Sequence, residues 1–398
     1  PDSELVLENA RGIVGRFMRS AVNVDIQHGQ VRRRAGCTLK LAGTDCHSLW
    51  TSGTQRLFVD GSSLKQLKGS VDALTTATLM TGLRQGAHMS YVKVNDLVYL
   101  TNGYIIKRLH DTTIEDVCPP PGPAFNLAPL TVGDSVVSVC TAYEFSNGEL
   151  GPASAVAAVR VAQAGVTVFG LPATWPAGVV ALQVYATEPG GMTPRRAERL
   201  TSPASSTTVY MPYGERCLTL DLAPMPPGEI VTELNGRLYC ASGTTLFVSE
   251  PYMHGLYNPV RGYIPFPEAI TMVVPCQNGV FISADQTYWL AGDPLGDKAE
   301  LNPVLPYKAV RGTSGPVPNA NACFWFSERG IVIGQQDGSV ENIQEANVAT
   351  GGGALGASLF REDQGTKRII AAVSSPSDTA MNIGSWMDAE VIRKETDL

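Results

Sequence analysis

The chain has 398 residues, of which 44% are hydrophobic and 17% are charged, a balance typical of a folded protein with a large buried or subunit-contacting surface. The net charge of -7 argues against a tight, general nucleic-acid binder, because such proteins usually present strong positive fields. The 40 Gly and 27 Pro, without a collagen-like period, indicate the many turns of an all-β protein.

Two further features concern the compartment. No stretch approaches the roughly 18 to 20 uninterrupted apolar residues that span a bilayer, and no basic-then-apolar signal pattern stands at the start. We therefore expect no membrane span and a soluble protein made in the cytoplasm. The eight cysteines are scattered without a Cys-x-x-Cys pair. We expect them to be reduced, buried thiols, with neither a disulfide framework nor a zinc site.

The first residues, 1–20, have little hydrophobic periodicity and are predicted to be an N-terminal arm. Residues 21–36 follow as a predicted β-hairpin, because apolar and polar residues alternate up to Ile26 and a turn at 27–30 precedes a second strand. The propeller-like part of the chain is expected to begin with this hairpin.

The same hairpin is basic. Between Arg11 and Lys40 seven basic residues stand against Asp25 alone. Arg32 and Arg34 are two residues apart on a strand and share a face, where guanidinium groups can pair with phosphate or with acids of a neighbouring subunit. We predict that Arg32 and Arg34 are subunit-contact residues; a solvated strand edge is the alternative.

One sequence pattern recurs along the chain: an apolar run, a polar turn and a second apolar run. Asp-Gly and Asn-Gly between apolar runs are strong hairpin signals. The central residues of most successive copies are about 41 to 51 residues apart, which is the period of propeller blades. The predicted hairpins lie at 57–64, 97–106, 238–247, 280–289, 331–340 and 380–384. The expected fold is all-β with β-propeller-like repeats, in a first part at 21–118 and a second part at 228–387.

One spacing is longer, since Tyr99 and Tyr239 are about 140 residues apart, one period plus an insert of roughly 100 residues. Pro-rich linkers at 118–123 and 222–228 flank this insert. Residues 124–222 are therefore predicted to form an inserted β-sandwich. Its predicted strands lie at 132–145, 155–161, 166–171, 179–187 and 207–210. The charged residues 388–398 are predicted to be a C-terminal tail.

Within the insert, the stretch from Tyr143 to Ser154 has an apolar-aromatic strand followed by Gly148-Glu149-Leu150-Gly151-Pro152-Ala153-Ser154. This stretch resembles fibronectin type III domains, in which a Gly-Glu-x-x-Pro-x-Ser turn follows such a strand. The resemblance covers the whole insert and implies an Ig-like or fibronectin-like sandwich. Members of that family serve mostly as spacers or adhesion surfaces, so the resemblance implies no chemistry.

The motifs of common enzymes are missing. A nucleophile elbow, a P-loop, a dinucleotide fingerprint and His-Glu-x-x-His are all absent. His47 and His88 stand at equivalent points of adjacent repeats, which favours a structural role. Asp293, Asp297 and Glu300 offer oxygen ligands to a cation, but solvated loop acids are the simpler interpretation. We predict no catalytic, cofactor-binding or metal-binding residues and a chain that is not an enzyme.

The opening of the chain carries a second resemblance. An Asn-x-Asp strand at 23–25, an arginine-rich strand at 29–36, His47-Ser48-Leu49-Trp50 and the hairpin from Leu57 resemble the start of tail nozzle or tail-hub proteins of short-tailed bacteriophages. That resemblance implies a structural virion protein of the phage tail. Such proteins form a ring, usually a hexamer, that continues the DNA channel below the portal and adaptor and supports genome retention and ejection.

The resemblance also implies partners. They are further copies of the chain, the portal and adaptor proteins, tail fibre or spike proteins, and DNA that passes without specific binding. Two alternatives stay open. One is a carbohydrate-binding or carbohydrate-active propeller, which requires clustered acids and aromatics on one face. The other is an adhesion or receptor-binding tail protein that uses the sandwich as its binding module.

Overall fold

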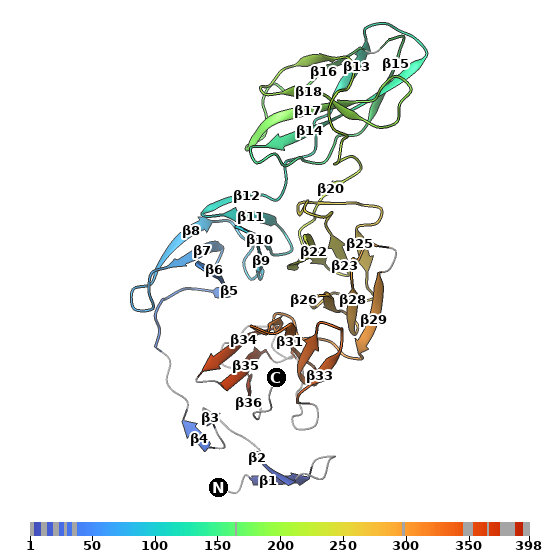
Figure 1. Ribbon diagram of the computed structural model, residues 1–398. Coiled ribbons are helices and arrows are strands. Elements are labelled where there is room, and N and C mark those ends of the chain that lie inside the picture. Colours follow the sequence, from blue (N-terminus) through green and yellow to red (C-terminus); the bar gives the residue numbers. More distant parts are fainter. Residues whose placement is uncertain are drawn as a thin grey trace. The chain divides into compact units, whose positions relative to one another are not determined.

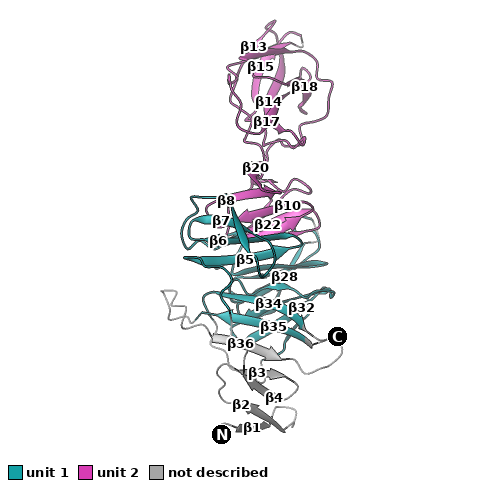
Figure 2. Ribbon diagram, turned by 90° about the vertical axis from the view of Figure 1, so that its left-hand side faces the viewer, with its two compact units in different colours: residues 1–89, 241–245, 265–398 teal, residues 90–240, 246–264 magenta. Residues whose placement is uncertain are grey.

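The structure is a computed structural model, and its description covers residues 4–8, 14–18, 24–27, 30–33, 38–163, 165–296, 299–344, 353–363, 366–374 and 387–392. In these residues every regular element is a β-strand (Figure 1). The chain divides into two compact units (Figure 2). Unit 1 comprises residues 1–89, 241–245 and 265–398, and unit 2 comprises residues 90–240 and 246–264. These limits differ from the predicted domain boundaries, which stay predictions.

Two hairpins open the chain. β1 (Glu4–Glu8) pairs with β2 (Val14–Met18), and β3 (Val24–Gln27) pairs with β4 (Gln30–Arg33), both antiparallel. The second pair confirms the predicted basic hairpin. The first pair lies in the segment predicted to be an N-terminal arm, and strands of five residues are too short to give a clear period of two in the sequence.

Besides these two hairpins, the described part of unit 1 contains four small antiparallel sheets, in each of which the strands follow one another in chain order. The first consists of β5 (Cys46–Ser52), β6 (Gln55–Asp60), β7 (Ser63–Lys68) and β8 (Thr75–Met80). The second consists of β26 (Met272–Cys276), β27 (Gly279–Ser283), β28 (Thr287–Ala291) and β29 (Glu300–Leu305). The third consists of β30 (Gly315–Pro316), β31 (Ala322–Ser327), β32 (Gly330–Gln335) and β33 (Val340–Asn342). The last consists of β34 (Gly356–Asp363), β35 (Thr366–Val373) and β36 (Met387–Ile392).

Unit 2 adds two sheets of the same kind. One consists of β9 (Ser90–Val94), β10 (Leu97–Thr101), β11 (Ile106–His110) and β12 (Thr113–Asp116). The other, which lies mostly in unit 2, consists of β21 (Ile230–Leu234), β22 (Arg237–Ser242), β23 (Thr245–Val248) and β25 (Tyr263–Pro265); residues 241–245 and Pro265 belong to unit 1. Two short strands also pair with each other: β20 (Ala223–Pro224), which precedes β21, and β24 (Leu256–Tyr257), which lies between β23 and β25 in the chain.

The predicted hairpins are confirmed wherever the structure describes them. They are the pairs β6–β7, β10–β11, β22–β23, β27–β28 and β32–β33. Gly61 and Gly338 adopt φ of 59° and 84° in two of the turns, the left-handed region that glycine reaches without steric cost. The copy expected at 380–384 lies outside the described residues.

Neighbouring sheets bury their faces against one another. In unit 1 the ring of Phe281 on β27 lies 4.4 Å from Trp289 and 5.2 Å from Trp325 of the next sheet, measured between ring centroids. Gly334 on β32 permits this packing, because a Cβ there would approach Phe281 to 2.5 Å. Small sheets that stack face to face in chain order are propeller-like repeats. The expected fold class, all-β with β-propeller-like repeats, is confirmed.

Residues of the insert form two sheets around one core in unit 2. β13 (Asn126–Pro129), β16 (Val166–Phe169) and β19 (Ser206–Val209) make one sheet. β15 (Ala157–Val161), β14 (Ser135–Phe145), β17 (Val179–Ala186) and β18 (Arg195–Leu200) make the other, in this order. Val139, Val168 and Leu182 are fully buried between them. The two sheets pack as a sandwich, while the fibronectin type III likeness stays a prediction.

Five strands of this sandwich match the predicted ranges, but β13 and β18 are missing from the sequence-based prediction. β18 has the sequence Arg-Arg-Ala-Glu-Arg-Leu and buries only Ala197 fully. It stands at the end of its sheet beside β17, and on its other side an isolated bridge joins Arg195 to Arg216. A charged edge strand carries little apolar alternation, and so it escapes a search for hydrophobic period.

Candidate functional site

The residues predicted to contact another subunit lie in the basic hairpin. Arg32 is on β4 and stands opposite Asp25 of β3 in the strand register. Arg34 lies outside the described residues. The prediction of a subunit contact at Arg32 and Arg34 therefore stays a prediction.

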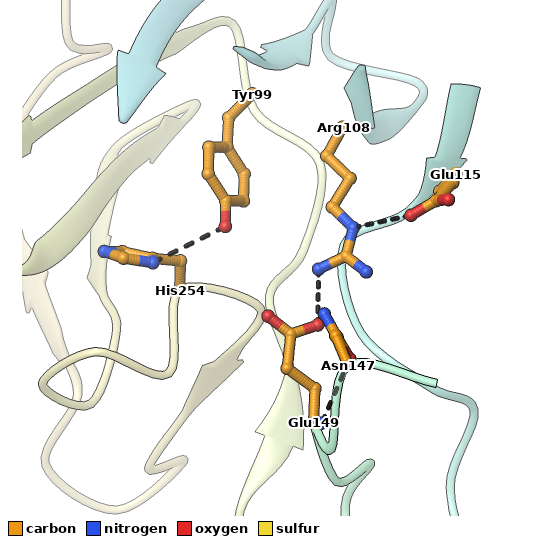
Figure 3. A network of polar contacts seen from close by, with 6 residues as sticks. All are labelled: Tyr99, Arg108, Glu115, Asn147, Glu149 and His254. Atoms are coloured by element: carbon orange, nitrogen blue, oxygen red, sulfur yellow. Dashed lines mark hydrogen bonds and ion pairs between the residues drawn. The ribbon is translucent and has the colours of Figure 1, made fainter. Parts of the chain in front are cut away.

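Arg108, which the sequence-based prediction did not single out, organises a charged network in unit 2. Arg108 lies on β11, between Tyr99 of β10 and Glu115 of β12 in the strand register. The residue is only 2% exposed. Its Nε donates to Glu115 Oε2 at 3.1 Å, and its Nη1 donates to Glu149 Oε2 (Figure 3). Buried arginines require such carboxylate partners, because an unpaired charge inside a protein is costly.

Glu149 reaches Arg108 from the turn that follows β14 of the sandwich. Gly148 adopts a φ of 84°, and Asn147 Oδ1 accepts a hydrogen bond from the Glu149 amide at 3.1 Å (Figure 3). The Phe145 amide donates to the Glu149 carbonyl at 2.9 Å. The Arg108 guanidinium also lies 5.7 Å from the centre of the Phe145 ring. The turn is thus held by its own hydrogen bonds in the form that presents the Glu149 carboxylate.

We call Arg108, Glu115 and Glu149 the Arg108 joint, because it links a sheet of the propeller-like part to the sandwich. Burial disfavours the charge of Arg108, but its hydrogen bond to Glu149 and the negative charge of Glu149 outweigh burial, and the pKa of Arg108 rises above its ordinary value. Both acids are about two-fifths exposed at their side chains, at 40% and 41%. The joint therefore pairs one buried cation with two partly hydrated anions.

Tyr99 and His254 lie next to this joint (Figure 3). The Tyr99 hydroxyl is 3.5 Å from His254 Nδ1, and the ring centroids are 5.4 Å apart. Burial, with Glu149 as a lesser cause, raises the pKa of Tyr99 to about 12. Burial also lowers the pKa of His254, against the opposing charges of Glu233 and Glu149. Both groups are therefore neutral near pH 7, and neither is poised to exchange a proton there.

Unit 1 holds a second polar contact, between His47 of β5 and His88 just before β9. Their ring centroids are 4.8 Å apart. His47 Nδ1 is 2.8 Å from Ser48 Oγ, which accepts a hydrogen bond from the Met89 amide at 2.8 Å. Ser48 has a φ of 55° and stands where the β5–β6 register shifts. A β-bulge of this kind redirects side chains, here toward the segment that carries His88.

Both histidines of this pair disfavour the charged form. Burial lowers the pKa of His47, with Asp45 opposing it. Burial, the neighbouring His47 and Arg311 lower the pKa of His88, and Asp45 again opposes. The sequence-based prediction gave these two residues a structural role at equivalent points of adjacent repeats. The structure adds that the two rings meet.

No group of three or more His, Cys, Asp and Glu side chains among the described residues is arranged to hold a metal ion. Of the loop acids Asp293, Asp297 and Glu300, Asp297 lies outside the description. No helix long and apolar enough to cross a bilayer occurs in the part of the chain that the structure describes.

Comparison with known proteins yields fold neighbours only. No family model and no curated protein matches the chain. The chain is similar over 90% of its length to 95% of BBS1N, solved in complex with ARL6DN, at 14% identity and a TM-score of 0.34. It is similar over 83% of its length to 73% of the N-terminal domain of Nup159, at 12% identity and a TM-score of 0.32. YCF48 from Cyanidioschyzon merolae matches at 9% identity and a TM-score of 0.30, over 80% of this chain and 88% of that one.

These three neighbours are β-propeller proteins. At such identities and scores they carry no argument about activity, ligand or partner. What this chain can do must therefore be inferred from its own residues.

Proposed function

We propose that this chain is a structural virion protein of a bacteriophage tail, and not an enzyme. It forms a ring, a hexamer by the family pattern, that continues the DNA channel below the portal and adaptor and supports genome retention and ejection. Its partners are its own copies, the portal and adaptor proteins, and tail fibre or spike proteins. DNA passes through the channel without specific binding, which the net charge of -7 favours.

The Arg108 joint is the observation that supports this proposal most directly. A guanidinium that is 2% exposed contacts carboxylates from a propeller-like sheet and from a sandwich turn. Pairing a buried charge in this way is sensitive to geometry, since a buried guanidinium that loses one of its carboxylates is less well compensated. Such a contact suits a part that must keep its alignment under mechanical load, as a tail conduit does.

The decisive experiment is an image of the purified full chain by electron microscopy, together with its mass in solution with and without the portal-side partner. A closed ring of several copies that docks on the portal side is expected, with antibodies against the chain labelling phage tails. A monomer that hydrolyses a capsular or cell-wall glycan, and loses this activity when one acid is changed, would overturn the proposal in favour of a carbohydrate-active propeller.

The basic hairpin gives a second test of assembly. Changing Arg32→Ser and Arg34→Ser together is expected to impair ring formation more than folding of the isolated chain, because burial at a subunit contact makes an ion pair worth more than the roughly 0–1 kcal/mol of an exposed one. Arg33→Ser is the control, since Arg33 alternates to the other face of β4. Normal assembly of the double variant at moderate salt means that the segment is a solvated edge.

An adhesion role for the sandwich is the second candidate, and one observation favours it. Tyr210, Met211 and Tyr213 follow β19 within four residues, and each is more than half exposed, at 62%, 54% and 71%. Exposed aromatics gathered in one segment are typical of contact surfaces. Changing Tyr210→Ser and Tyr213→Ser would then reduce attachment to host cells and leave ring assembly intact.

A further inference from the structure

Tyr252, in the loop between β23 and β24, has a backbone conformation that tyrosine rarely adopts. Its φ is 58°, in the left-handed region. The other described non-glycine residues with positive φ are Ser, Asn, Asp and Gln residues, so Tyr252 is the only aromatic among them. Positive φ is unfavourable for L-residues, above all for those with bulky side chains. Such a residue persists only where its surroundings enforce the conformation, and strained residues of this kind cluster at functional sites.

Two turns enforce the conformation of Tyr252. The Met253 amide donates to the Glu250 carbonyl at 3.1 Å and closes a four-residue turn, in which Tyr252 is the third residue. With Pro251 before it, this turn resembles a type II turn, whose third position normally takes glycine or asparagine. The Tyr252 amide also donates to the carbonyl of Gly236, in the turn between β21 and β22, at 2.7 Å. Backbone hydrogen bonds thus hold a tyrosine where glycine would be free of strain.

The ring of Tyr252 lies flat on Gly236. A Cβ added to Gly236 would lie 2.7 Å from Cε1 of the ring and 3.0 Å from both Cδ1 and Cζ. A point almost equally far from three neighbouring ring atoms lies above the plane of the ring, and not at its edge. Gly236 therefore covers one face of the ring, yet Tyr252 is 81% exposed. The opposite face of the ring is the part that solvent reaches.

The turn under the ring also supplies hydrogen-bonding groups. Asn235 precedes Gly236 and is exposed. Glu233 Oε1 accepts a hydrogen bond from the Gly236 amide at 2.7 Å. We call Glu233, Asn235 and Tyr252 the Tyr252 platform. It combines an aromatic face, an amide that both donates and accepts hydrogen bonds, and a carboxylate that accepts them.

We propose that the Tyr252 platform binds an uncharged pyranose sugar, such as a glucose, galactose or N-acetylglucosamine unit of a glycan. One side of such a sugar is a flat array of C–H groups with partial positive charge, which packs on the negative face of an aromatic ring. Hydroxyl groups surround that side, where Asn235 and Glu233 can bond with them. The carboxylate of Glu233 disfavours acidic sugars and phosphate-bearing ligands, because like charges repel.

This inference does not rest on the proposed function. Binding a sugar without cleaving it is compatible with a structural tail protein, whereas cleavage of a glycan is the outcome that overturns the proposed function. The failure of one is therefore distinguishable from the failure of the other.

The experiment is saturation-transfer NMR of the full chain with the methyl glycosides of glucose, galactose and N-acetylglucosamine at millimolar concentration. Glucuronic acid is the acidic comparison. The expected result is saturation of C–H groups on one side of at least one uncharged sugar, and a weaker signal from glucuronic acid. The proposal is overturned if none of the three uncharged sugars receives saturation.

The variant Tyr252→Gly separates binding from folding, because glycine adopts a φ of 58° without strain. We expect this variant to unfold at a temperature close to that of the unsubstituted chain and to lose the sugar signal. Tyr252→Phe should retain the signal, because it keeps an aromatic face. Tyr213→Ser is the matched control, since Tyr213 of the sandwich is 71% exposed. Sugar binding that survives Tyr252→Gly but is lost in Tyr213→Ser would overturn the proposal and place the contact on the sandwich.

Discussion

The Arg108 joint of unit 2 and the pair of His47 and His88 in unit 1 both place polar side chains in largely buried surroundings, but they differ in charge. Each brings polar groups from separate segments together in a largely buried place. The joint keeps its charge, because Glu115 and Glu149 compensate the guanidinium. The histidine pair gives up its charge, because burial and Arg311 disfavour the imidazolium form of His88. The comparison shows that a buried contact depends on charge pairing in one region and on neutrality in the other.

The largest expected effect comes from removing the central cation. Arg108→Ala deletes the guanidinium and leaves two carboxylates facing each other across the space, so we expect a loss of about 3 kcal/mol in the free energy of unfolding. Chemical denaturation of the full chain measures it. Arg261→Ala is the matched control, because Arg261 pairs with Glu250 at the surface with its side chain 62% exposed. That pair is worth only about 0–1 kcal/mol. Equal losses of unfolding free energy in both variants would mean that Arg108 stabilises the chain no more than an exposed ion pair does.

A smaller effect is expected from Glu149→Gln, which keeps the shape of the side chain but removes its charge. A hydrogen bond to a charged group contributes about 1.5–3 kcal/mol, and the 41% exposure of the Glu149 side chain places the loss at the lower end of this range. The amide of Phe145, bonded to the Glu149 carbonyl, should exchange its hydrogen faster. Glu115→Gln is the matched control, since it removes the charge of the other carboxylate that pairs with Arg108, the one on the propeller-like sheet. Faster exchange at Phe145 in that variant as well would contradict the role of the turn.

The smallest effect is the pH dependence of the histidine pair. The pKa values of His47 and His88 lie below the ordinary 6.5, so the folded chain binds fewer protons than the unfolded chain at mildly acidic pH. The free energy of unfolding should therefore decline as the pH falls through about 6.5 and below. Urea denaturation at a series of pH values measures the slope. Asp45 opposes the decline and Arg311 strengthens it.

Replacing both histidines of the pair, as His47→Gln and His88→Gln, should make this slope shallower. Part of it will persist, because the pKa of His254 beside the Arg108 joint is lowered as well. His110→Gln is the matched substitution at an exposed histidine outside the pair. An unchanged slope in the double variant would show that the pair does not depend on neutrality.

The sequence by itself determined the local elements of this protein. Asp-Gly and Asn-Gly turns between apolar runs located the hairpins β6–β7 and β10–β11, and their spacing indicated propeller-like repeats. Five strands of the sandwich were found in the same way. These features are local, because a turn and a period of two depend on neighbouring residues alone. β18 was missed for the same reason, since its charged sequence carries no such period.

Only the tertiary structure decided which distant side chains meet. Glu149 belongs to a turn that the sequence analysis quoted, but its partner Arg108 lies 41 residues away in another sheet. Nothing in the strand from Ile106 to His110 marks its arginine as buried. Cys140 of β14 and Cys217 likewise belong to one buried cluster, although they are far apart in the sequence. Burial and contact between remote segments depend on how sheets stack and loops return, which no local pattern of residues encodes.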